Sequence, residues 1–237
     1  MVLLGVVAFA ASTVAAVTGF GGAVVLLPVV VAVFGVRDAI PILTVAQLLG
    51  NAGRVVTNRQ EIAWPVVGWY SAGAVPAALL GGALFAQAPL AALTRLLGVF
   101  LVVMVAFWYF RRDSFPRLSR PGFAPLGAAS SFLSALVGSA GPVTAPFFVA
   151  HGLVKGAYIG TEALAAVVTH ATKLIAYGNT ATLNAPAALT GAGLGVVMIC
   201  GSVAGKKLLE RVSEKRFVML VQVTLAVAGV VLLVKGG

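Results

Sequence analysis

Apolar runs of about 20 residues follow one another along nearly the whole chain, and they constrain the fold more than any other feature. That length is what an α-helix needs to cross the hydrocarbon core of a membrane. Only 9% of the residues are charged, against roughly 25% in a soluble domain. The sequence therefore predicts an all-α integral membrane protein and leaves no room for a soluble catalytic domain.

Two glycine-rich breaks interrupt the apolar runs. The first reads Thr18-Gly19-Phe20-Gly21-Gly22-Ala23, and the second reads Gly138-Ser139-Ala140-Gly141-Pro142. Both have a Gly-x-x-Gly spacing, and their first glycines are 119 positions apart. The same offset relates Asn51 to His170 and Arg54 to Lys173. Since a break, a polar residue and a cation recur in the same order, we interpret the chain as an internal repeat with one site shared between the copies.

The expected architecture is an inverted repeat of two helical halves. We place the first membrane repeat at residues 1–110, a basic cytoplasmic linker at 111–121 and the second, inverted repeat at 122–237. Each half is expected to hold a glycine-broken helix pair or a re-entrant hairpin plus three membrane helices, which makes about 8–10 membrane segments. The expected helices span 2–17, 23–34, 38–57, 62–86, 91–110, 122–137, 142–153, 156–177, 185–206 and 217–234.

The cations indicate an orientation in the membrane. The formal net charge is +10, and most cations gather in short loops between the apolar runs. This distribution is typical of the positive-inside rule, and no RNA-binding motif or basic–aromatic stripe accompanies it, so we expect no nucleic-acid partner. With the 111–120 linker and the 206–216 turn in the cytoplasm, both chain ends lie outside. The first break is then entered from outside and the second from inside, as in many secondary transporters.

The breaks themselves favour an anion as ligand. A broken helix leaves backbone N–H groups unpaired at the start of its second half, and that end carries roughly half a positive charge. Glycine lets a ligand approach this backbone closely. Two inverted breaks would aim two helix starts at one point, where a small oxyanion fits. The alternative is that the glycines only allow close helix packing. We expect binding residues in both breaks: Gly19, Phe20, Gly21, Gly22, Gly138, Ser139 and Gly141.

Polar side chains on the helix after each break complete the predicted substrate site. Gln47, Asn51 and Arg54 are spaced i, i+4 and i+7, so they share one helical face. In the second half we expect the same role for three further side chains: Thr169, His170 and Lys173. Arg54 and Lys173 would supply positive potential. The alternatives are that these cations extend to the membrane surfaces and that Asn51 only bonds a neighbouring helix.

Glu162 and His170 are the titratable groups that we single out for proton coupling. They are eight residues apart on one helix, which places them on the same face two turns apart. Ionisable groups inside a membrane are costly and usually functional, and histidine titrates near neutral pH. The alternative is a neutral His170 with Glu162 paired to Lys155. Cys200 is the single cysteine, so we expect no disulfide, no metal and no cofactor.

With these residues in view, the chain resembles the sulfite exporter TauE/SafE family of membrane permeases. The resemblance rests on the two breaks with Pro28 and Pro146 downstream, on the helix with Asn51, and on the later segments Lys155-Gly156, Thr161-Glu162-Ala163, Thr169-His170 and Gly201-Ser202-Val203-Ala204-Gly205. It covers nearly the whole chain and implies a multi-pass protein of the bacterial inner membrane. It also implies transport of a sulfur-containing anion such as sulfite, thiosulfate or sulfoacetate. One departure is Ser139-Ala140, where the family would have a more glycine-rich second break.

The sequence leaves three mechanisms to compare. The first is an exporter that works by alternating access with proton coupling. The second is an uncoupled anion channel on the same scaffold. The third, an intramembrane enzyme with Ser139 and His170 paired, lacks a catalytic motif, so no catalytic residue is assigned. We expect the anion and membrane lipid as partners, with a homodimer as a candidate assembly.

Overall fold

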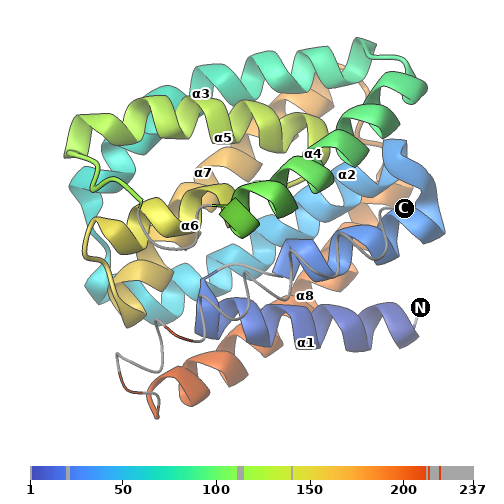
Figure 1. The fold of residues 1–237 in the computed structure, drawn as a ribbon. Coiled ribbons are helices and arrows are strands. Elements are labelled where there is room, and N and C mark those ends of the chain that lie inside the picture. Colours follow the sequence, from blue (N-terminus) through green and yellow to red (C-terminus); the bar gives the residue numbers. More distant parts are fainter. Residues whose placement is uncertain are drawn as a thin grey trace.

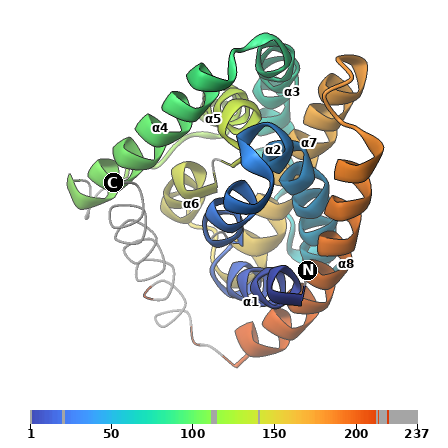
Figure 2. The same ribbon diagram turned by 90° about the vertical axis from the view of Figure 1, so that its right-hand side faces the viewer.

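The computed structural model of the protein describes residues 2–19, 22–110, 115–139, 141–211, 213 and 219. These residues form α-helices and two short 3₁₀-helices, with no strand among them. The elements are α1 Val2–Thr18, α2 Gly22–Asn58, η1 Arg59–Glu61, α3 Trp64–Gln87, α4 Leu90–Phe110, η2 Arg120–Gly122, α5 Phe123–Val137, α6 Gly141–Ala150, α7 Lys155–Asn179 and α8 Ala185–Leu209. α2 and α7 lie in the middle of the bundle, between α3 and α5 on one side and α1 and α8 on the other (Figures 1 and 2).

These bounds confirm most of the predicted helices to within a few residues. The predicted segments 23–34 and 38–57 are joined in α2, which kinks at Gly35 with φ 75° and ψ 164°. The segment predicted at 142–153 is shorter, since α6 ends at Ala150 and Gly152 turns the chain with φ 100°. The predicted last helix, 217–234, lies outside the described residues apart from Met219. Residues 111–114 of the predicted linker also lie outside them.

Each glycine-rich break is the turn of a helical hairpin. After the first break, Gly22 returns to the side of α1, where an added Cβ would lie 3.3 Å from Ala11 O and from Ala15 Cβ. After the second break, Phe148 near the end of α6 packs on Phe123 at the start of α5, with ring centroids 5.1 Å apart. Figure 1 shows the first hairpin opening toward the end of the bundle that holds the N-terminus, and the second opening toward the opposite end.

Glycines on α8 bring it into close contact with α1 and α2. A Cβ added at Gly191 would meet Ile42 O of α2 at 2.6 Å, and one added at Gly201 would meet Phe9 O of α1 at 2.6 Å. Helices that cross a membrane gain little from the hydrophobic effect when they associate, so close backbone packing through small residues is a main source of their attraction. The glycines therefore fix which helices neighbour α2, and so which side chains face its polar side.

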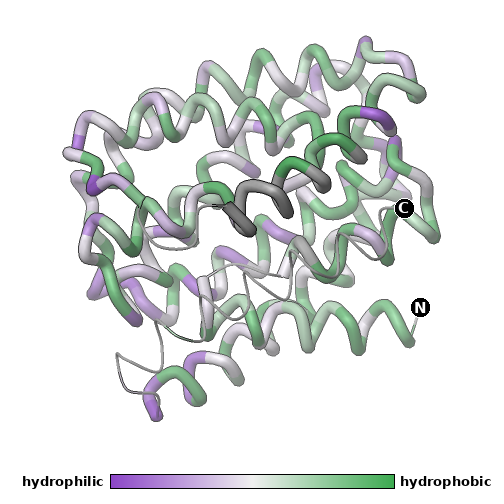
Figure 3. Tube along the Cα trace, in the orientation of Figure 1, coloured by the Kyte–Doolittle hydropathy of each residue, from purple (hydrophilic) through white to green (hydrophobic). Residues whose placement is uncertain are grey.

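The outer surface of the bundle is apolar. Large hydrophobic side chains are exposed on several helices, among them Leu80, Leu84, Leu189 and Val196. In the part of the chain that the structure describes, three helices are long and apolar enough to cross a membrane: Val25–Glu61, Trp64–Gln87 and Ala185–Leu209. Hydrophilic residues gather toward the ends of the bundle (Figure 3). These features are those of a membrane protein.

Candidate functional site

The two breaks have the same local geometry. Gly19 has φ 83° and donates its N–H to Ala15 O at 2.8 Å, while Gly138 has φ 95° and donates its N–H to Ser134 O at 2.9 Å. A glycine with positive φ just after the last helical residue is a common way to end a helix, because other residues pay a steric penalty there. α1 and α5 therefore end in the same manner, at positions that the sequence pairs at one offset.

A buried cation holds each break. Arg54 of α2 donates from Nη1 to Gly19 O at 2.5 Å and to Ala15 O at 3.2 Å. Lys173 of α7 donates from Nζ to Gly138 O at 3.2 Å and to Ser134 Oγ at 3.3 Å. The last carbonyl groups of a helix lack hydrogen-bond partners within the helix and carry partial negative charge. A cation there donates hydrogen bonds to these carbonyl groups and offsets their charge. Neither cation extends to a membrane surface.

The helices that follow the breaks begin beside a small, partly open cavity. Gly22 and Ala23 at the start of α2 line it, as do Ser139 and Gly141 at the start of α6. The first N–H groups of a helix have no partner within that helix. The cavity has a volume of about 50 Å³. Since a water molecule needs roughly 10–15 Å³ of this kind of space, the cavity has room for about four water-sized groups.

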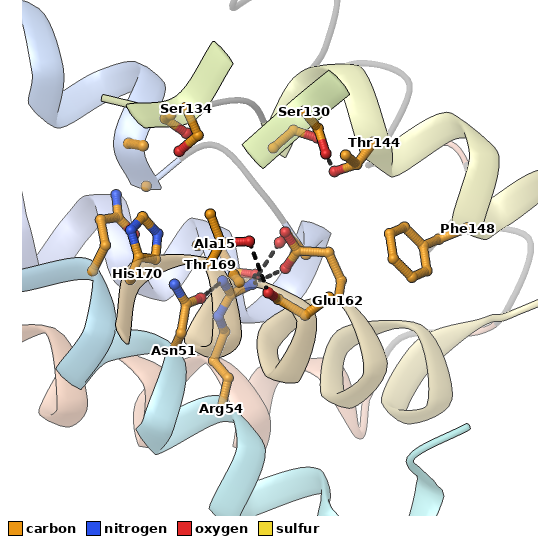
Figure 4. Close-up of a pocket in the computed structure, with 18 of the residues that line it drawn as sticks. Ala15, Asn51, Arg54, Ser130, Ser134, Thr144, Phe148, Glu162, Thr169 and His170 are labelled. Atoms are coloured by element: carbon orange, nitrogen blue, oxygen red, sulfur yellow. Dashed lines mark hydrogen bonds and ion pairs between the residues drawn. The ribbon is translucent and has the colours of Figure 1, made fainter. Parts of the chain in front are cut away.

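Side chains from α2, α3, α5, α6 and α7 line the cavity (Figure 4). α2 supplies Gln47, Asn51 and Arg54, and α7 supplies Glu162, Thr169 and His170. The remaining polar lining residues come from α3, α5 and α6: Tyr70, Ser130, Ser134 and Thr144. Phe148 covers one end of this set. Helix starts, an arginine, amides and hydroxyls thus converge on one cavity, which is the usual make-up of a small-ligand site.

Arg54, Asn51 and Glu162 point toward one another at the centre of the site (Figure 4). Arg54 Nη1 lies 3.3 Å from Glu162 Oε2, and Arg54 Nη2 donates to Asn51 Oδ1. Both members of the ion pair are buried. Glu162 therefore pairs with Arg54 of the other half of the chain, and not with Lys155 as one interpretation of the sequence had it.

Besides Glu162 Oε2, which faces Arg54, two buried polar atoms in the cavity wall make no hydrogen bond to any described residue: Gln47 Nε2 and His170 Nδ1. Both side chains are at most 6% exposed. A buried polar group without a partner costs free energy, so such groups are rare in native proteins and call for a ligand, an ion or water. Both atoms therefore mark the cavity as a candidate binding site for a polar ligand.

Hydroxyl groups connect the cavity wall to the α3–α5 interface. Thr169 Oγ1 and Ser131 Oγ are 2.8 Å apart, and Tyr70 OH lies 2.9 Å from Ser130 Oγ. α3 and α5 approach this closely because Gly127 has no side chain. A Cβ added there would lie 2.2 Å from Tyr70 O. These bonds tie α3, α5 and α7 together around the cavity and fix the direction of its hydroxyls.

The structure brings most of the predicted site residues together. The predicted residues that line the cavity are Gly19, Gly22, Gln47, Asn51, Arg54, Ser139, Gly141, Glu162, Thr169 and His170. Gly138 and Lys173 do not line it, because the ammonium group of Lys173 is bound to the break itself. Phe20 and Gly21 lie outside the described residues.

Sequence reasoning missed part of the cavity wall. Ser130 and Ser134 are spaced i, i+4 within an apolar run, a signal that marks one polar helix face. Thr144 and Phe148 follow Gly141 at i+3 and i+7, so they share one face of α6. Tyr70 carries no such signal, because it is the single cavity-lining residue of α3. Among the described residues, no group of three or more histidine, cysteine or acidic side chains is placed to hold a metal ion.

A comparison with protein families gives one match that covers almost the whole chain. The family model described as sulfite exporter TauE/SafE matches residues 4–232. No curated protein and no solved structure matches the chain.

Proposed function

We propose a transport function from the premise that the chain belongs to the sulfite exporter TauE/SafE family, which is a family of membrane transporters and not of enzymes. In this proposal the chain carries a small sulfur oxyanion across the bacterial inner membrane, through the cavity between the two breaks. The observation that carries the proposal is the cavity where two helix starts meet a buried arginine and the unbonded Gln47 Nε2 and His170 Nδ1.

Each part of the cavity has a role in binding the anion. The N–H groups at the starts of α2 and α6 and the Nε2 group of Gln47 donate to its oxygens, and Asn51, Thr169 and His170 add further hydrogen bonds. Arg54 supplies a full positive charge. Lys173 does not contact the anion in this proposal. It holds the second break in place through its hydrogen bond to Gly138 O.

Transport proceeds by alternating access in this proposal. The two hairpins open toward opposite ends of the bundle, which supports inverted halves that take turns in exposing the shared cavity (Figure 1). η1, η2, the start of α7 and the end of α8 carry Arg59, Arg120, Lys155, Lys206 and Lys207. These elements gather at one end of the bundle, which supports that end as the cytoplasmic side. Glu162 and His170 are the groups for a coupled proton.

Flux into proteoliposomes of the purified protein tests the proposal. Sulfite, thiosulfate, sulfoacetate and sulfate are supplied in turn, with and without a pH gradient. Saturable flux of a compact sulfur oxyanion that responds to the gradient is the expected result. Saturable flux that ignores the gradient favours the uncoupled channel or a uniporter. No flux of any of the four anions would refute the proposed substrate class.

A further inference from the structure

We propose that the Glu162 carboxylate occupies the anion's place beside Arg54 in the empty protein, and that the transported anion displaces it as Glu162 takes up one proton. This inference rests on the proposed function and states how the anion and the proton are linked. Its basis is the geometry of the Arg54–Glu162 pair and the two unbonded atoms in the same cavity wall, Gln47 Nε2 and His170 Nδ1.

The ion pair is held by charge rather than by hydrogen bonds. Arg54 Nη1 carries two N–H groups, and Gly19 O and Ala15 O accept from this atom. Nη2 donates to Asn51 Oδ1. Glu162 Oε2 lies 3.3 Å from Nη1 and makes no hydrogen bond of good geometry to any described residue. A buried carboxylate is normally hydrogen-bonded, so this oxygen is poorly stabilised where it lies.

An oxyanion in the cavity meets better partners than Glu162 does. The cavity offers it Gln47 Nε2 and the N–H groups at the starts of α2 and α6. Gln47 belongs to the same helical face as Arg54, and both side chains line the cavity. A free anion also reorients to suit these donors, whereas the Glu162 carboxylate is tethered to α7.

The anion and the ionised carboxylate exclude each other. Both would lie in a cavity of about 50 Å³ beside one arginine. Two unit negative charges about 5 Å apart at an effective dielectric constant of about 20 repel enough to weaken binding roughly a hundredfold. Uptake of a proton by the Glu162 carboxylate removes this repulsion. The positive charge of Arg54 then attracts the anion instead of the carboxylate. One proton is therefore gained at Glu162 for each anion bound, and the proton and the anion move across the membrane together.

Few other titratable groups face Glu162. Arg54 approaches from α2, Tyr70 from α3, and Tyr158 and His170 are on its own helix. The described residues of α1, α5 and α6 contribute no titratable side chain. Among these groups, His170 is the competing proton site, and it makes no ion pair in the structure.

The test measures anion binding and proton uptake together, with purified protein in weakly buffered detergent solution and a pH indicator dye. Thiosulfate is the probe because it takes up no proton itself near neutral pH. Wild-type protein is expected to take up about one proton per thiosulfate bound. Its affinity is expected to fall up to tenfold per pH unit on the alkaline side. Glu162→Gln is expected to take up none, to bind with pH-independent affinity, and to bind roughly a hundredfold more tightly than wild type at high pH.

Two further variants complete the design. Glu61→Gln is the matched control, because Glu61 pairs with Lys206 at 3.5 Å at the end of the bundle, away from the cavity. It should behave as wild type. Glu162→Asp keeps the charge and should keep the proton uptake, which guards against misfolding of the glutamine variant.

The outcomes separate this inference from the proposed function. Binding by wild type without proton uptake, or full uptake in Glu162→Gln, overturns the inference and leaves the transport function standing. If no sulfur oxyanion binds to wild type and none is transported, the proposed function fails and this inference fails with it.

Discussion

Replacing Gly19 by alanine tests whether the first break has the geometry described here. The change has two costs. Gly19 has φ 83°, a conformation that costs an alanine about 1–2 kcal/mol. The new Cβ would also lie 2.0 Å from Tyr158 Cε1, so the buried Tyr158 ring must move. Overpacking of this kind typically costs about 1–3 kcal/mol more.

Gly138→Ala is the matched control for this change. Gly138 has φ 95° and ends α5 as Gly19 ends α1, so the backbone cost is similar. Its added Cβ would meet two side-chain atoms at ordinary or slightly tight distances, Leu27 Cδ1 at 3.3 Å and Ile40 Cγ1 at 3.6 Å. The difference between the two variants therefore isolates the clash with Tyr158, at about 1–3 kcal/mol.

Thermal unfolding in detergent measures this difference. For a chain of this length, 1 kcal/mol corresponds to about 2–4 °C in Tm, so Gly19→Ala should unfold roughly 2–12 °C below Gly138→Ala. In a Tyr158→Ala background the gap should close, because the ring that causes the clash is gone. Equal Tm values for the two single variants would refute the packing of Tyr158 over the first break.

Three shorter predictions follow. Lys173→Met leaves Gly138 O and Ser134 without their donor, so stability should fall by about 1–3 kcal/mol in thermal unfolding, and an unchanged Tm would contradict its role in holding the break. His170→Ala should weaken thiosulfate binding about tenfold or more while proton uptake persists; loss of uptake would move the coupling role from Glu162 to His170. Gly201→Ala should lower the Tm because its Cβ meets Phe9 O at 2.6 Å, whereas Gly193→Ala, with nothing within 4 Å, should not.

Much of the local structure follows from the sequence. The apolar runs predict the helices of the described residues to within a few positions, because helix formation in a membrane depends on local length and hydropathy. The positions of the two turns are predicted equally well, since each contains a glycine that adopts positive φ. The i, i+4, i+7 spacing also places Gln47, Asn51 and Arg54 on one face, and all three line the cavity.

The partners of the charged residues depend on the tertiary structure. The sequence suggests that Arg54 and Lys173 act alike toward the anion, but Lys173 binds Gly138 O and Ser134 Oγ and does not line the cavity. Likewise, Lys155 is closer to Glu162 in the sequence, but Glu162 pairs with Arg54.

The helices follow from the sequence and the side-chain partners do not, because the first depend on local interactions and the second on contacts between distant segments. Helical periodicity is a property of neighbouring residues, so the sequence by itself determined the helices, their polar faces and the glycine turns. The rotation and neighbours of each helix are set by packing between segments far apart in the chain, such as Gly191 against Ile42 and Gly127 against Tyr70. Only that packing decided that Arg54 meets Glu162, and that Tyr70, Ser130 and Thr144 close the cavity around them.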